Sequence, residues 1–418
     1  MPGDISAKVY SKAAQGNSHI LEAGSTAQTV AYTQNFMHFE PLTIAGALVL
    51  CIWIYLVLLR GGFWPVGREM PQPQKANLAA GIVAVIPARN EAAVIGEAVA
   101  SLLGQTVRDL HIVLVDDNSS DGTAELARQA AGKAGKLDSL TILSGSEPPR
   151  GWTGKLWAVH QGLQKASERD PDFLLLTDAD TLHAPENIAA LVAIADAGRY
   201  DLTSFMVRLR CQALAEKFLI PAFVYFFFLL YPPAWVNDPR RRTAAAAGGC
   251  MLIRPSAPAR IGGVEAIRGE IIDDCALARE VKRGGGKVWL GLTETAASLR
   301  NYESFGEIRR MVSRTAFNQL RHSALLLIAT LTGMILAFLL PVALLFFGAV
   351  LFWLGAAAGA LILTSYLPMV RFYRLNPLWA LSLPAAAVFF MWATLDSAMQ
   401  FWRGKGGTWK GRVQDPLA

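Results

Sequence analysis

The apolar residues of this chain follow two different patterns. Long uncharged stretches occupy Leu42–Leu59 and Ala324–Val370, and another apolar segment covers about Leu378–Thr394. As a helix, the first stretch would be about 27 Å long, close to the roughly 30 Å of a bilayer's hydrocarbon core. The second stretch is too long for one crossing and suits two. The pattern predicts a transmembrane helix at 41–60 and two to three more within 324–400.

Between these stretches, short apolar runs alternate with helical patterns. The runs are Ile82–Ile86, His111–Val115, Leu140–Leu143 and Phe173–Thr177. Buried runs of this length between helices are typical of βαβ units. In open parallel sheets, ligands bind beyond the carboxyl ends of the strands. The sequence therefore predicts an α/β domain over 81–323, Rossmann-like with a mostly parallel sheet.

One apolar and aromatic segment, Phe218–Val236, lies inside this domain and contains three prolines. Because a crossing there would split the soluble domain across the membrane, we interpret 218–236 as an interfacial helix partly buried in lipid. A buried helix of the protein core is an equal alternative. In the interfacial interpretation, Phe226 and Phe227 lie on the side from which a lipid acceptor enters.

Composition supports a soluble domain joined to membrane spans. Of the 418 residues, 53% are hydrophobic and 17% are charged, and the mean hydropathy is +0.32. These values exclude a disordered chain and disfavour a fully soluble one. The net charge is +6, but no basic stripe with interleaved aromatic residues occurs, so no nucleic-acid partner is expected. The four cysteines form no Cys-x-x-Cys pair, which disfavours a zinc site or a disulfide framework.

The charges beside the first apolar stretch predict the topology. Arg60, Arg68 and Lys75 follow it closely, whereas the lysines before it lie farther away among acidic residues. The positive-inside rule then places the α/β domain in the cytoplasm. The inner membrane of a bacterium is the expected location.

Three further segments complete the organisation. Residues 1–40 form a polar N-terminal segment that is compatible with disorder, 61–80 a linker, and 401–418 a basic tail. Three crossings within 324–400 would put this tail outside, against the charge rule. Either the rule fails there or one segment is re-entrant, and the sequence leaves both open.

Three pairs of acidic residues stand where strands are expected to end. They are Asp116 and Asp117, Asp178 and Asp180, and Asp273 and Asp274. Each pair alone is more ordinary as a helix cap or a turn. Together they would repel one another unless a cation lies between them. Because an Asp-x-Asp pair can ligate Mg²⁺ or Mn²⁺ together with diphosphate oxygens, the pairs favour a metal–nucleotide site.

No glycine-rich phosphate loop follows the first strand, so dehydrogenase and NTPase functions lose their main support. The acidic pairs and their flanking residues instead resemble glycosyltransferase family 2, which has the GT-A fold. The resemblance runs from about Gly81 to Ser323. It implies that the nucleotide sugar is bound by Pro87, Ala88, Arg89, Asn90, Glu91, Asp116, Asp117 and Asp178. It also implies that Asp116 contacts the uracil base and that Asp180, with Asp178, holds the metal.

The resemblance extends to the acceptor side. Gly248, Gly249 and Cys250 resemble the loop that lines this side, and Asp273 and Asp274 stand where the family has Glu-Asp. Asp274 is thereby the implied general base, with Asp273 beside it.

Two basic residues are further candidates for the site. Processive and ceramide-type members of the family carry a Gln/Arg-x-x-Arg-Trp motif farther along the chain. Only its arginine, Arg314, is present here, which disfavours a processive polymerase. Lys155 is a candidate contact to the diphosphate, and an exposed lysine at a helix start is the alternative.

A closer resemblance is to hopanoid-biosynthesis-associated glycosyltransferases, carried by Gly151–Lys155, Tyr231–Asp238 and Gly407–Arg412. The implied reaction is inverting transfer of a sugar from a nucleotide-diphosphate sugar, with a uracil bias, to a lipid hydroxyl. A transferase acting on polyprenyl phosphate is the runner-up. A sugar nucleotidyltransferase would need a glycine-rich signature, and a transporter would need ionisable groups inside its spans.

Overall fold

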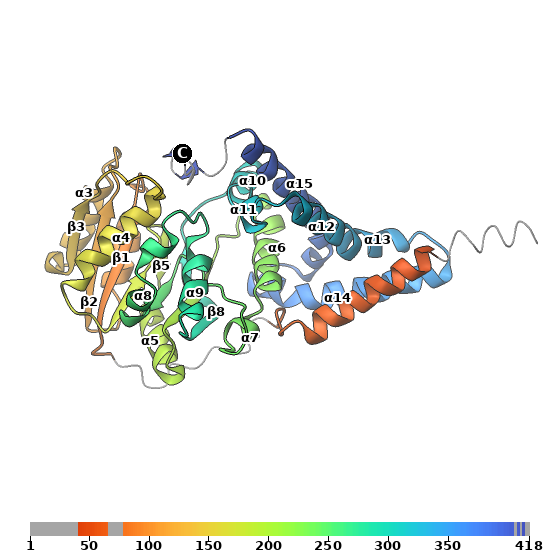
Figure 1. Cartoon of the computed structure of the whole chain (residues 1–418), viewed down its shortest axis with the longest axis horizontal. Helices are drawn as coiled ribbons and strands as arrows, with labels where there is room; N and C mark the ends of the chain where they lie inside the picture. Colours follow the sequence, from red (N-terminus) through yellow and green to blue (C-terminus); the bar gives the residue numbers. More distant parts are fainter. Residues whose placement is uncertain (1–40, 66–77, 405–407, 410–411, 414–418) are drawn as a thin grey trace, which may run out of the picture. The chain divides into compact units, whose positions relative to one another are not determined.

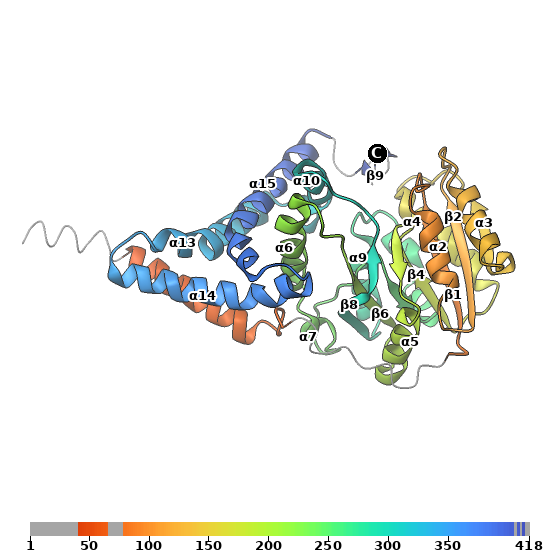
Figure 2. The ribbon, with the colours of Figure 1, turned by 180° about the vertical axis from the view of Figure 1, so that it is seen from behind.

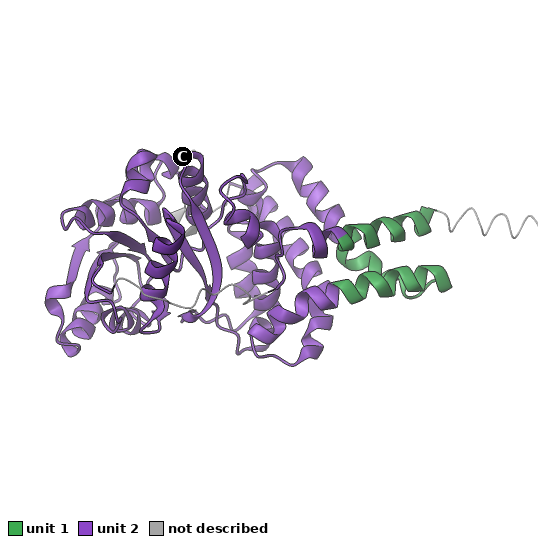
Figure 3. Cartoon of the chain, turned by 90° about the horizontal axis from the view of Figure 1, so that it is seen from below, with its two compact units in different colours: residues 1–54, 335–361 green, residues 55–334, 362–418 purple. Residues whose placement is uncertain are grey.

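The structure is a computed structural model that describes residues 41–65, 78–404, 408–409 and 412–413. The predictions for 1–40, for most of the linker and for most of the tail lie outside the described residues. The chain divides into two compact units, one of residues 1–54 and 335–361 and the other of 55–334 and 362–418 (Figure 3).

A mixed eight-stranded sheet forms the centre of the larger unit (Figure 1). In sheet order its strands are β3 (Leu140–Ser144), β2 (Asp109–Asp116), β1 (Gly81–Ala88), β4 (Phe173–Leu176), β7 (Met251–Ile253), β6 (Leu202–Arg208), β8 (Val288–Ser298) and β5 (Thr181–His183). The first four strands are parallel, and β7 runs antiparallel to both β4 and β6. The predicted α/β fold with a mostly parallel sheet is confirmed.

Helices cover both faces of this sheet, which explains the continuous apolar runs of β1 and β2. They are α2 (Ile95–Leu103), α3 (Thr123–Lys133), α4 (Gly154–Ser167), α5 (Asn187–Gly198), α8 (Ser256–Arg260) and α9 (Asp273–Arg283). Figure 1 shows α4 and α9 in front of the sheet, and Figure 2 shows α2 and α5 on the opposite face. Helix α4 lies so close to β1 that a Cβ on Gly162 would come within 2.4 Å of Val85.

One prediction about the acidic pairs is wrong. Asp273 and Asp274 do not end a strand but begin helix α9. Their negative charges stabilise the first turn of that helix, where backbone N–H groups carry partial positive charge. The other two pairs do follow strands, since Asp116 ends β2 and Asp178 comes just after β4.

Five helices of the described chain are long and apolar enough to cross a membrane. They cover Pro41–Leu59, Leu214–Val236, Ala324–Leu344, Ala349–Phe372 and Pro377–Trp402. They include α6 (Leu214–Leu230), α7 (Pro233–Val236), α12 (Ala324–Met334), α13 (Leu340–Leu344), α14 (Ala349–Phe372) and α15 (Leu383–Trp402). Within the smaller unit, the Trp53 indole N–H donates to the Ala337 carbonyl at 2.7 Å.

Helix α6 is the segment for which an interfacial and a buried position were equal alternatives. The strands on either side of it, β6 and β7, are hydrogen-bonded neighbours, with Ser204 opposite Met251. A single crossing would leave these strands on opposite sides of the membrane, so α6 begins and ends on one side. It packs against α15, where the Phe226 and Phe390 ring centroids are 5.3 Å apart. Its position at a lipid interface stays a prediction.

Candidate functional site

A cavity of about 90 Å³ opens at the carboxyl edge of the sheet. Its lining residues come from the ends of β1 and β4, the start of α4, the loop before α9, and the segments after β8 and after helix α10 (Phe305–Ser313). They are Pro87, Glu91, Thr153, Lys155, Asp178, Ala179, Asp180, Glu270, Ile271, Asp273, Arg300 and Arg314. A smaller pocket of about 20 Å³ shares Lys155, Asp178 and Asp273 and is otherwise largely apolar.

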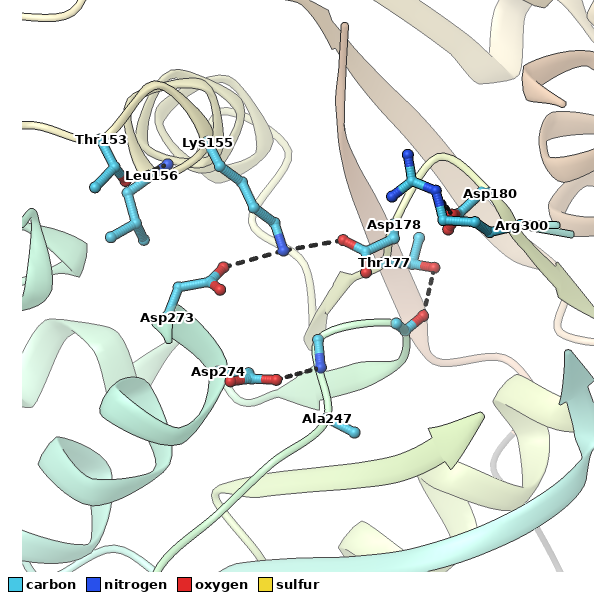
Figure 4. Close-up of polar contacts among 12 residues, drawn as sticks. Thr153, Lys155, Leu156, Thr177, Asp178, Asp180, Ala247, Asp273, Asp274 and Arg300 are labelled. Carbon is cyan, nitrogen blue, oxygen red and sulfur yellow. Dashed lines mark hydrogen bonds and ion pairs between the residues drawn. The ribbon is translucent and has the colours of Figure 1, made fainter. Parts of the chain in front are cut away.

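Lys155 lies between two of the predicted carboxylates (Figure 4). Its Nζ is 3.0 Å from Asp178 Oδ1 and 3.2 Å from Asp273 Oδ2. Burial alone would lower the pKa of Lys155, but Asp178, Asp273 and Asp274 outweigh burial and raise it above its usual value. Lys155 is therefore a charged internal cation of the site, and the alternative of an exposed lysine at a helix start is wrong.

Asp178 and Asp180 both line the cavity but differ in their electrostatics. Burial works against ionisation of Asp178, yet Lys155 holds its pKa below the usual value. Burial and the charge of Asp178 raise the pKa of Asp180 to about 6. The nearest cation to Asp180 is Arg300, whose Nε lies 3.8 Å from Oδ2. Asp180 is thus a carboxylate with only a weak ion-pair partner.

This arrangement fits a divalent cation. The described residues hold no group of three or more His, Cys, Asp or Glu side chains that could bind a metal. Mg²⁺, however, is commonly held by one or two carboxylates, with substrate phosphates and waters as its other ligands. Asp178 and Asp180 supply two such carboxylates. A cation between them would offset the charge of Asp178, which helps to raise the pKa of Asp180.

The two aspartates at the start of α9 have different surroundings. Asp273 lines the cavity and pairs with Lys155. Asp274 accepts a hydrogen bond from the backbone N–H of Gly248 at 2.9 Å (Figure 4). It accepts another from the backbone N–H of Cys275 at 2.7 Å. Burial and the charge of Asp273 raise the pKa of Asp274 to about 6. Asp274 is not among the residues that line the cavity, but it lies beside Gly248, where a Cβ would be 3.5 Å both from Asp274 Oδ2 and from Lys155 Nζ.

The loops after β1 and β2 are hydrogen-bonded to each other beside the cavity. Arg89 Nη1 donates to the Asp117 carbonyl at 2.5 Å, and the Asn90 side chain accepts from the Ser120 N–H at 3.0 Å. The Asp116 carboxylate accepts from the Ser119 N–H at 3.0 Å. Of the nucleotide-binding residues predicted in these loops, Pro87 and Glu91 line the cavity, whereas Ala88, Arg89, Asn90, Asp116 and Asp117 line neither pocket.

The predicted acceptor-side residues are not all brought together. Gly248 lines the smaller pocket and Arg314 the larger one. The Gly249 carbonyl accepts from Thr177 Oγ1 at 2.8 Å. The Cys250 side chain is fully buried and faces Asn187, so its thiol belongs to the core. Phe226 and Phe227, on α6, line neither pocket.

Sequence reasoning missed Arg300 and Glu270, which line the cavity from loops without a recognised motif. It also left His183 unassigned. His183 Nε2 lies 2.9 Å from Thr177 Oγ1, and Asn187 Nδ2 lies 3.0 Å from its Nδ1. Since Thr177 donates to Gly249, it accepts from Nε2–H. Burial lowers the pKa of His183 to about 4, so a neutral imidazole positions the strand end that carries Asp178.

Comparison with known sequences identifies a protein family that part of this chain resembles. Residues 83–258 match the model of Glycosyl transferase family 2. This match supports a glycosyltransferase domain over these residues.

Two curated relatives match part of this chain. Both are undecaprenyl-phosphate 4-deoxy-4-formamido-L-arabinose transferases. The one from Edwardsiella ictaluri is 33% identical over 125 residues, which are 28% of this chain and 34% of the relative. The one from Proteus mirabilis is 31% identical over 140 residues, which are 32% of this chain and 39% of the relative. The chain thus spans little more than a third of these relatives, and neither name refers to hopanoids.

The fold resembles that of a solved mannosyltransferase, PcManGT from Pyrobaculum calidifontis, in complex with GDP-Man and Mn²⁺. The TM-score is 0.52 at 18% identity, covering 87% of this chain and 99% of that one. At this identity the likeness shows a common GT-A-like fold.

Proposed function

We propose that this chain is a membrane-bound glycosyltransferase that moves a sugar from a nucleotide-diphosphate sugar to a lipid hydroxyl. The observation that carries the proposal is the cavity at the carboxyl edge of the family 2 domain, where Lys155 joins Asp178 to Asp273. The apolar helices support a lipid as acceptor. The cytoplasmic face of a bacterial inner membrane is the matching location, because nucleotide sugars are made in the cytoplasm.

The donor would be held by the charged residues of the cavity. Lys155, Arg300 and Arg314 supply positive charge for a diphosphate. Asp178 and Asp180 would hold Mg²⁺ or Mn²⁺, and the metal would neutralise the negative charge of the leaving diphosphate. Asp116, at the end of β2, would contact the nucleoside, and UDP-sugars are the first donors to try.

Asp274 is the proposed general base. A hydroxyl must lose its proton as it attacks the anomeric carbon, and a carboxylate with a raised pKa accepts a proton more readily than an ordinary one. Burial and Asp273 give Asp274 that property, with a pKa of about 6. Its hydrogen bonds to the Gly248 and Cys275 amides fix the carboxylate plane, and both oxygens keep lone pairs for the acceptor.

A polyprenyl-phosphate acceptor is the second candidate, favoured by the names of both curated relatives. A phosphate oxygen is already ionised at neutral pH, so its attack needs no base.

An acceptor screen separates these candidates. Purified full-length enzyme is given a radiolabelled nucleotide sugar with either a hydroxyl-bearing lipid extract or undecaprenyl phosphate, and labelled lipid is measured. We expect label in the hydroxyl lipid from the wild type and at most a hundredth of that from Asp274→Asn. Label in undecaprenyl phosphate alone, undiminished by Asp274→Asn, would establish the second candidate.

A further inference from the structure

A basic and aromatic cluster lies in the larger unit, away from the cavity. It consists of Arg60, Trp235 and the consecutive Arg240, Arg241 and Arg242, and is called the arginine–tryptophan cluster below. The Cζ atoms of Arg60 and Arg241 are each 5.1 Å from the centre of the Trp235 ring. None of these residues lines either pocket.

The cluster joins two segments far apart in the sequence. Arg60 Nε donates to the Leu229 carbonyl at 3.0 Å, which fixes the end of the first apolar helix to the end of α6. Gly61 follows with φ of +60°, and a Cβ there would lie 2.6 Å from Trp235 Cδ1. Only glycine fits this contact, so the indole is held in a defined position between the two segments.

The charge of the cluster is mostly uncompensated. Arg240 pairs with Asp238 at 3.0 Å, and its side chain is 88% exposed. In the described part of the chain, no ion pair involves Arg60, Arg241 or Arg242. A guanidinium that stacks on an aromatic ring keeps its N–H edges available, and these edges match the oxygens of a phosphate.

Exposed apolar side chains lie beside this charge. Leu58 and Leu59, directly before Arg60, are 71% and 67% exposed, and Leu230, before α7, is 51% exposed. The Trp64 indole N–H donates to the Val57 carbonyl at 2.9 Å, which adds a second tryptophan at the same helix end. Exposed leucines next to arginines and half-buried tryptophans are typical of a bilayer interface.

We propose that the arginine–tryptophan cluster is a binding site for the phosphate headgroup of an anionic phospholipid. The leucines contact the acyl chains, while the guanidinium groups bind the phosphate. A lipid surface is favoured over a soluble phosphate because the charge directly follows two apolar helices that end side by side. The inference does not depend on the transferase activity, since the site is separate from the cavity.

Binding of phosphatidylglycerol to the detergent-purified full chain tests the proposal. Native mass spectrometry gives the apparent Kd for dioleoyl phosphatidylglycerol and, for comparison, dioleoyl phosphatidylcholine. The variant replaces Arg240, Arg241 and Arg242 by Gln. The matched control replaces three exposed arginines of the α/β domain, Arg108, Arg128 and Arg169, and removes the same charge. Each arginine near an anionic surface changes affinity roughly fivefold.

We expect phosphatidylglycerol to bind at least tenfold more tightly than phosphatidylcholine. The cluster variant should lose this preference, the control variant should keep it, and glycerol 3-phosphate should not displace the lipid. Equal phosphatidylglycerol affinity in the wild type and the cluster variant would overturn the proposal, as would equal losses in both triple variants. Displacement by glycerol 3-phosphate would show a soluble-phosphate site instead.

Discussion

The ammonium group of Lys155 sets the charge balance of the cavity. It separates Asp178 from Asp273, which would otherwise face each other at the same cavity wall. A metal held by Asp178 and Asp180 would therefore bind beside a positive charge that is already present, so Lys155 both orders the carboxylates and competes for one of them.

Replacing Lys155 by Met should destabilise the protein and abolish most transfer. Breaking a buried ion pair costs about 3–5 kcal/mol, and the 37% exposure of the Asp178 side chain reduces the expected loss to about 2 kcal/mol. Lys165→Met is the control, since Lys165 lies on the same helix and pairs with Glu168 at the surface. Thermal unfolding measures the difference. Equal melting temperatures of the two variants would contradict a structural role for Lys155.

The pH dependence of transfer should report Asp274. A general base works only when deprotonated, so the rate should rise as the pH increases through about 6 and level off above it. Asp274→Asn should lower the rate by roughly 10²–10⁴-fold and remove this rise. The Asp273→Asn variant should still show the rise of the rate with pH, but at a lower pH. The substitution removes the charge that helps to raise the pKa of Asp274. A pH profile of Asp274→Asn that matches the wild type would assign the base elsewhere.

At the scale of elements, helix α9 connects the candidate base to the end of α7. Asp274 lies in its first turn, and near its other end the Lys282 ammonium donates to the carbonyls of Trp235, Val236 and Thr243 at 3.3, 2.6 and 2.7 Å. The ammonium therefore ties the helix to the segment that follows α6.

Lys282→Met should loosen this connection. The Val236 and Thr243 carbonyls lose their charged donor, and unpaired buried acceptors cost about 1–3 kcal/mol each. We expect a lower melting temperature and faster hydrogen exchange of 233–243, whereas Lys133→Met, an exposed lysine at the end of α3, should change neither. Unchanged exchange in 233–243 would show that Lys282 does not hold the segment.

The sequence predicted those strands and helices that a short run of neighbouring residues is enough to define. The runs at Ile82–Ile86 and His111–Val115 became β1 and β2 because a strand buried on both faces is apolar throughout. Asp273 was misplaced because a short apolar run before an acidic pair precedes a helix as readily as it ends a strand. The ion pairs of Lys155 and the packing of α6 on α15 depend on distant partners, which no local pattern contains.

At the scale of the whole molecule, two ion pairs help to predict on which side of the membrane the C-terminal tail lies. Arg374, after α14, pairs with Glu294 of β8 at 2.8 Å. Asp396, in the second half of α15, pairs with Arg309 at 2.7 Å, on helix α10 (Phe305–Ser313), which leads to Arg314 in the cavity wall. We therefore expect both ends of α15 to lie on the same side of the membrane as the α/β domain. We expect α12–α13 and α14 to cross the membrane and α15 not to cross.

Cysteine labelling in intact cells tests this topology. Cysteines introduced at Gln129, on the exposed surface of α3, and at Gly404, just after α15, should both be protected from a membrane-impermeant reagent until the membrane is opened. If the cysteine at Gln129 is protected but the cysteine at Gly404 is labelled from outside, α15 crosses the membrane. Labelling of both from outside would reverse the orientation of the domain.

Donor turnover is the most direct test of a nucleotide-sugar site in the acidic cavity. Release of nucleoside diphosphate is measured for the purified chain with a panel of nucleotide sugars, in Mg²⁺ or Mn²⁺ and in EDTA, alongside Asp180→Asn. We expect that at least one donor is consumed with metal, that EDTA stops its consumption reversibly, and that Asp180→Asn reduces it at least tenfold. Undiminished turnover in EDTA and in Asp180→Asn, or no turnover of any donor, would contradict this expectation.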